Sequence, residues 1–161
     1  MAQQENTPDS ANQKQFQIQK IYLKDVSLET PNTPDIFRDN WQPDVNVQLG
    51  NNARALAEGV HEVVTTVTVT AKLGDKTAYL VEVQQAGIFT IAGFEQRELG
   101  AMVGSYCPTI LFPFAREAIA DLISKAGFPP LLLAPVNFDA IYAQHQQQGQ
   151  QPATAQQPEV H

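Results

Sequence analysis

The chain of 161 residues and 17.7 kDa fits a single domain with a core of moderate size. Ten basic residues against seventeen acidic ones give a net charge of −7, which argues against a nucleic-acid partner because phosphate binding needs a basic surface. The single cysteine excludes an internal disulfide. The opening residues MAQQENTPDSANQKQ lack a signal peptide's apolar segment, and no run reaches the roughly 18 apolar residues of a membrane helix. We expect a cytoplasmic protein.

Both ends of the chain are polar and show no hydrophobic periodicity. They are rich in glutamine, and the C-terminal end also carries prolines. Such segments cannot bury enough apolar surface to offset the entropy lost on ordering. We therefore expect disordered tails over residues 1–15 and 144–161, around one folded domain of residues 16–143.

Four extended segments are predicted within this domain. FQIQKIYLKDVSLE alternates apolar and polar residues, and the proline-rich segment after it is long enough to cross to another part of the sheet. EVVTTVTVTAKL is dense in β-branched residues, which favour strands. A turn at Gly74-Asp75 leads into TAYLVEVQQAG, and Gly87 separates that strand from a shorter one, IFTI.

Helical patterns follow the strands. EQRELGAMVGSYC predicts a short helix, and TILFPFAREAIADLISKAG predicts an amphipathic helix that stops at Gly127. FPPLLLAP is expected to be extended because of its prolines. NFDAIYAQHQ predicts a closing helix capped by Asn137. The order β-β-β-β-α-α-α indicates an α+β fold, a four-stranded antiparallel sheet with helices packed on one face.

Alternation along two of the strands separates chemically different faces. In the first strand, simple alternation places Leu23 with Asp25 and Glu29. In TAYLVEVQQAG, Val81 and Val83 lie on one side, whereas Leu80 and Glu82 lie on the other. Acids on a sheet surface ordinarily serve solvation or edge protection. Together with the net charge of −7, they also suit a docking patch for a basic partner.

The sequence offers little catalytic chemistry. Its glycines do not match a phosphate-binding loop or a dinucleotide fingerprint, and three histidines with one cysteine do not make a zinc site. Cys107 and His61 are the one candidate nucleophile–base pair, and the simpler interpretation is that Cys107 fills the core. We therefore predict that the protein is not an enzyme and has no catalytic residues, no bound metal and no cofactor.

Large apolar residues occur where prolines interrupt the chain. They either close the core or line an apolar groove or an assembly interface. A sheet with two half-apolar faces needs two coverings, and this favours an oligomer. The residues concerned are Phe37, Trp41, Phe112, Phe114, Phe128, Leu131, Leu132 and Leu133.

Several long segments together resemble one family, the SecB protein-export chaperones. They occur in the family's order and cover nearly all of the expected domain. The segments are IYLKDVSLE, FRDNWQPDV, VTVTA, EVQQAGIFTIAG, GSYCPTILFPFARE and LAPVNFDAIY.

The resemblance implies a cytosolic homotetramer, a dimer of dimers, that keeps unfolded precursor proteins competent for translocation and delivers them to the ATPase SecA. An acidic outer sheet surface receives the zinc-bearing C-terminal region of SecA in this family. By motif, that surface corresponds to Asp25, Glu29, Leu80 and Glu82, whereas tetramer assembly corresponds to Val81, Val83 and Gln85. The family's long apolar cargo grooves lie beside the crossover and the long helix, and the resemblance therefore implies a groove lined by Trp41, Phe112, Phe114, Leu131, Leu132 and Leu133. The alternative is a SecB-like general holdase that serves another pathway, such as a toxin–antitoxin system.

Overall fold

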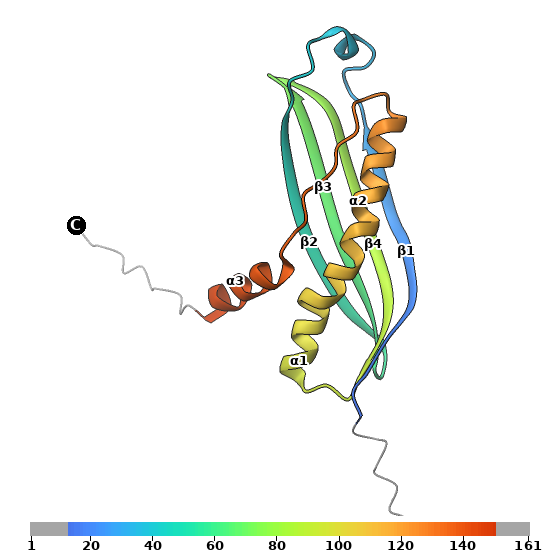
Figure 1. The fold of residues 1–161 in the computed structure, drawn as a ribbon, viewed down its shortest axis with the longest axis vertical. Coiled ribbons are helices and arrows are strands. Elements are labelled where there is room, and N and C mark those ends of the chain that lie inside the picture. The colour runs from blue at the N-terminus through green and yellow to red at the C-terminus, as the bar shows by residue number, and fades with distance from the viewer. Residues whose placement is uncertain (1–12, 151–161) are drawn as a thin grey trace, which may run out of the picture.

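The computed structural model describes residues 13–150, which form a four-stranded antiparallel sheet with helices on one face (Figure 1). The strands lie in the order β1-β4-β3-β2. The predicted α+β fold with a four-stranded antiparallel sheet is confirmed. The strands are β1 (Gln15–Glu29), β2 (Asp44–Ala57), β3 (Val60–Leu73) and β4 (Lys76–Ala92).

The predicted crossover runs from one edge of the sheet to the other. It leaves β1, contains the short 3-10 helix η2 (Asp35–Arg38) and enters β2, an edge strand for which the sequence analysis predicts no strand. The sequence of β2, DVNVQLGNNARALA, has few β-branched residues. Pairing with β3 along almost its whole length makes it a strand nevertheless. Tertiary pairing overrides local propensity here.

The prediction that Gly87 divides two strands is wrong, because β4 runs through it without interruption. Gly87 pairs with Ile21 on one side and with Val63 on the other. A Cβ atom at this position would lie 2.6 Å from Cε2 of Phe89 and 3.2 Å from Cδ2 of Leu111. Only glycine, which has no Cβ atom, leaves enough space at this position for the buried Phe89 ring.

Replacing Gly87 with alanine should destabilise the fold by about 1–3 kcal/mol, because the added methyl group overpacks the space that Phe89 occupies. Urea unfolding followed by circular dichroism measures this loss. Gly74→Ala is the comparison, since a Cβ there meets nothing within 4 Å, although its φ of +59° adds backbone strain. An unchanged midpoint for Gly87→Ala would contradict the packing argument.

Two irregularities in β1 change which side chains share a face. The pairing with β4 shifts by one residue between Ile18 and Lys20, and again between Leu23 and Asp25. Leu23 pairs with Gln85 and Asp25 pairs with Gln84, so these two side chains lie on opposite faces. The predicted common face of Leu23 with Asp25 is therefore wrong, because a β-bulge inserts one extra residue.

The two helices predicted after the sheet form one continuous helical segment. It consists of α1 (Gln96–Ala101), the π-helix η3 (Met102–Tyr106) and α2 (Cys107–Lys125), with Pro113 inside α2. Gly127, with φ of +92°, follows its end, as predicted. Helix α2 crosses the face of the sheet (Figure 1).

The closing helix α3 (Phe138–Gln150) begins as predicted and ends later than predicted. Asn137 caps it, since its Oδ1 accepts a hydrogen bond of 3.1 Å from the backbone N–H of Ala140. The helix continues into the segment that the sequence analysis assigned to the C-terminal tail, because glutamine is a good helix former and the first turn is anchored. Residues 1–12 and 151–161 of the predicted tails lie outside the described residues.

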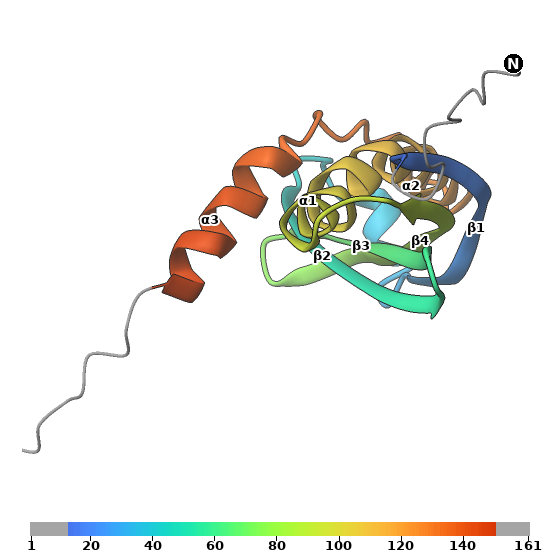
Figure 2. The ribbon, with the colours of Figure 1, turned by 90° about the horizontal axis from the view of Figure 1, so that it is seen from below.

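The core lies between one face of the sheet and α2. Buried side chains of β3 and β4, such as Val67 and Val83, share a cluster with Ile119 and Ile123 of α2. We call this the inner face. Figure 2 shows α1 and α2 on this side of the strands, whereas α3 projects away from the sheet. The opposite, outer face carries no helix of the described chain (Figure 2).

Candidate partner-binding surfaces

The four residues predicted to contact SecA lie together on the outer face. Glu29 pairs with Leu80, and Asp25 and Glu82 follow along the same two neighbouring strands. Asp25 and Glu29 are exposed, whereas Leu80 and Glu82 are half-buried. Thr68 on β3 donates a hydrogen bond of 3.1 Å to Oε2 of Glu82. These four residues form what we call the acidic patch.

The three residues predicted at the oligomer interface are buried within the protomer. Val81 and Val83 are fully buried and belong to the core cluster beneath α2, and Gln85 is only 3% exposed. Nε2 of Gln85 donates a hydrogen bond of 3.0 Å to the backbone oxygen of Tyr22. The folded chain itself covers these side chains, so we expect any influence on assembly to act through the core.

The candidate groove residues do not share one exposed surface. Phe112 and Leu133 are buried in the core, where the Phe112 ring meets Phe138 edge to face at 5.7 Å. Trp41 is half-buried, with its ring 5.4 Å from that of Phe128. Leu131 also packs against the core. These four residues therefore help to close the core, which is one of the two interpretations that the sequence left open.

The other two candidates are exposed. Phe114 is 48% exposed on α2, and Leu132 is 79% exposed in the extended segment after it. Leu132 lines a shallow pocket of about 390 Å³ in which apolar and polar side chains mix: Pro113, Ala120, Arg116, Glu117, Asp121 and Ser124. The pocket lies apart from the four candidates that close the core.

Sequence reasoning missed two apolar stripes at the margins of the inner face. One lies on β1, where the side chains are between 36% and 51% exposed, and the other on β2, where they are about 42% exposed. Simple alternation already places Ile18, Val26 and Leu28 on one side of the first strand but does not show that they stay exposed, and the bulges hide Leu23 from it. The strand β2 itself was not predicted. The stripes consist of Ile18, Leu23, Val26 and Leu28 on β1, and of Val45 and Val47 on β2.

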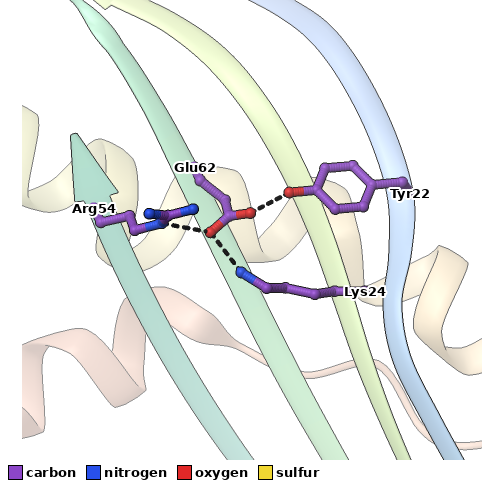
Figure 3. A network of polar contacts seen from close by, with 4 residues as sticks. All are labelled: Tyr22, Lys24, Arg54 and Glu62. Atoms are coloured by element: carbon purple, nitrogen blue, oxygen red, sulfur yellow. Dashed lines mark hydrogen bonds and ion pairs between the residues drawn. The ribbon is translucent and has the colours of Figure 1, made fainter. Parts of the chain in front are cut away.

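A buried carboxylate on the outer face was also missed. Glu62 of β3 is 5% exposed, and its Oε1 lies 2.8 Å from Nζ of Lys24 and 3.0 Å from Nε of Arg54 (Figure 3). The Tyr22 hydroxyl donates to its Oε2 (Figure 3). The network ties β1 and β2 to β3 from either side. The sequence shows only a glutamate at the start of a predicted strand, and nothing in it reveals these partners.

The network shifts the ionisation of its members. Hydrogen bonds from Lys24 and then Tyr22 lower the pKa of Glu62 to about 2, against the opposing effect of burial. Burial, followed by the hydrogen bond to Glu62, raises the pKa of Tyr22 to about 12. At neutral pH the carboxylate is therefore ionised and the phenol is protonated.

We expect Glu62 to make folding sensitive to acid. Its folded pKa of about 2 lies below the ordinary value of 4.5, so its contribution is complete above about pH 5 and is lost as pH falls towards 2. The contribution amounts to about 2 kcal/mol, since Lys24 and Arg54 are partly exposed to water. Urea unfolding of wild type and Glu62→Gln should differ most at pH 7, differ less at pH 3 and converge near pH 2. A constant difference would contradict this assignment.

The candidate nucleophile pair gains no support from its surroundings. Cys107 is fully buried, and burial raises the pKa of its thiol to about 12, which keeps it protonated at neutral pH. Nδ1 of His61 is buried and has no hydrogen-bond partner. Among residues 13–150, no three His, Cys, Asp or Glu side chains cluster as metal ligands. Within the same range, no helix is long and apolar enough to cross a membrane.

An α+β fold whose sheet has exposed apolar margins on one face and an acidic patch on the other suits a protein that binds other proteins. The family model for SecB, described as preprotein translocase subunit SecB, matches residues 9–149. The chain therefore belongs to the SecB family of protein-export chaperones, and the resemblance found in the sequence is confirmed.

Relatives named protein-export protein SecB cover most of the chain. The protein from Nitrosococcus oceani is 60% identical over 154 residues, which is 94% of each chain. That from Methylococcus capsulatus is 59% identical over 141 residues, 88% of this chain and 91% of the relative. A solved structure of the SecB-like chaperone Rv1957 of Mycobacterium tuberculosis, in complex with a ChAD peptide from the HigA1 antitoxin, has a TM-score of 0.62 at 18% identity. It covers 75% of this chain and 89% of its own, and shares the fold.

Proposed function

We propose that the chain is a cytosolic chaperone that binds unfolded precursor proteins, keeps them competent for translocation and delivers them to SecA. Membership of the SecB family supports this proposal. The structural observation that carries it is the separation of two surfaces, since the apolar stripes flank the inner face while the acidic patch lies on the outer face. A carrier with separate surfaces can hold a client and meet its receiver at the same time.

Client binding would use the exposed apolar side chains of the inner face. Burying such side chains contributes about 25 cal/mol per Å² of apolar area, whatever the exact sequence of the client. The free edge of β2 also offers backbone groups to an extended segment. A folded client buries its own apolar residues and has no free strand to offer, so unfolded chains are preferred.

Assembly into a tetramer, a dimer of dimers, belongs to the same proposal. β1 is an edge strand of the sheet, and its free backbone groups can pair with a second copy. Repeated weak contacts with one long client around a tetramer would raise the overall affinity.

The test mixes the chain with a precursor protein in its denatured and in its folded form. We expect a stoichiometric complex with the denatured form alone, and a free chaperone of four times 17.7 kDa by light scattering. A monomer, or equal affinity for the folded precursor, would contradict the proposal. Cys107→Ala, which adds no atoms to the core, should leave client binding intact if the thiol has no chemical role.

The second candidate is a SecB-like holdase for another pathway, such as a toxin–antitoxin system. This candidate is considered because the chain shares its fold with the Rv1957 chaperone, which was solved with an antitoxin peptide. The acidic patch favours the export function, because it suits a basic receiver such as the C-terminal region of SecA. Direct titration with that SecA region and with an antitoxin peptide distinguishes the two functions.

A further inference from the structure

The acidic patch depends on a single extra residue in β1. Leu23 pairs with Gln85, and Asp25 pairs with Gln84, so Lys24 is the additional residue of the bulge. If the strand alternated regularly after Leu23, then Asp25 and Glu29 would lie on the inner face. The bulge therefore turns both acids towards the outer face.

The bulge is held from both faces of the sheet. On the outer face, Nζ of Lys24 lies 2.8 Å from Oε1 of Glu62 (Figure 3). Two residues before Lys24, the Tyr22 hydroxyl donates a hydrogen bond to the same carboxylate (Figure 3). On the inner face, Nε2 of Gln85 donates 3.0 Å to the backbone oxygen of Tyr22. Glu62 lies on β3, with β4 between it and β1. Its contacts therefore fix the bulged segment relative to the centre of the sheet.

We propose that Glu62 is a positioning residue for SecA docking, which acts by holding Lys24 in the bulge so that Asp25 and Glu29 stay beside Glu82 on the outer face. This inference rests on the proposed function, since it takes the acidic patch as the docking surface. Glu62 itself is 5% exposed and does not meet the partner. It acts through the register of β1.

Lys24 provides the sharper test, because two explanations predict opposite signs. Removing a positive charge beside the acidic patch should strengthen binding of a basic partner if only the net field matters. If Lys24 positions the acids, Lys24→Met should weaken binding roughly tenfold. Lys24→Arg keeps the ion pair with Glu62 and should stay within about twofold of wild type. Calorimetric titration with the zinc-bearing C-terminal segment of SecA measures the three affinities.

Glu62→Gln should weaken the same binding, and Glu98→Gln is its matched control. Glu98 is also a glutamate paired with one lysine, but it lies on α1 and contacts Lys14. The two variants change the net charge equally. Circular dichroism and light scattering at the titration temperature establish that each variant is folded and assembled as wild type is.

A second readout reports the register without any partner. Ser27 pairs with Glu82, so Ser27→Cys/Glu82→Cys should form a disulfide in the bulged strand, whereas loss of the bulge would bring Val26 opposite Glu82. In the Glu62→Gln background, we expect less of this disulfide and more of that formed by Val26→Cys/Glu82→Cys. Cys107 is fully buried and remains in place. Mass spectrometry after mild oxidation counts each species.

The outcomes separate the inference from the function on which it rests. Weaker docking of Lys24→Met together with a shifted cross-link supports it. Stronger docking of Lys24→Met, or weaker docking with an unchanged cross-link, overturns it. A shifted cross-link with unchanged docking overturns it as well. If wild type itself does not bind the SecA segment, both the proposed docking and the inference built on it are wrong. The cross-link then still shows whether Glu62 sets the register of β1.

Discussion

Replacing Glu82 with lysine is expected to weaken SecA docking by at least about tenfold and to leave client capture unchanged. Glu82 lies between Ser27 of β1 and Thr68 of β3, near the centre of the acidic patch. Lysine would place a positive charge among the acids that receive a basic partner, and would also remove the acceptor for the Thr68 hydroxyl. The client surfaces lie on the opposite face of the sheet, so they should not respond.

Two titrations check this expectation, one with the SecA C-terminal segment and one with a denatured precursor. Glu58→Lys is the matched control, because Glu58 is an exposed acid in the turn between β2 and β3, away from the patch. It should dock as wild type does, and the wild-type affinity should fall as salt is added. Loss of docking and client capture together in Glu82→Lys would contradict the two-surface arrangement.

The second large effect is expected from Val83→Ala. Val83 is fully buried and shares a core cluster with Ile119 of α2, so the truncation should cost about 2–3 kcal/mol through lost burial and a cavity. The resemblance links this position to tetramer assembly, whereas the structure places it inside the protomer. We therefore expect any change in assembly to accompany a loss of protomer stability, because the variant weakens the packing of α2 against the sheet.

Val47→Ala is the matched control for this variant. It makes the same chemical change on the same face of the same sheet, but Val47 is 42% exposed and should change stability by less than about 0.5 kcal/mol. Urea unfolding and sedimentation at one fixed chain concentration measure both properties. Dissociation of Val83→Ala with unchanged unfolding would instead place Val83 in direct contact with another subunit.

Local patterns predict much of this fold because their signals are strong. The β-branched run of β3 and the cap at Asn137 fall where the sequence places them. The weak strand β2 was missed because its pairing with β3, rather than its own residues, makes it a strand. Gly87 resembles a break in the sequence, but only the folded chain shows that it accommodates the ring of Phe89.

The candidate surfaces divide in the same way. Opposite faces for Glu82 and Val83 follow from alternation along an unbulged part of β4, so the sequence by itself determined them. The family was also readable, since several long segments occur in its order. Only the tertiary structure decided that Asp25 joins Glu82 on the outer face. A single extra residue inverts the alternation, and the contacts that hold it come from Glu62, which is remote in sequence.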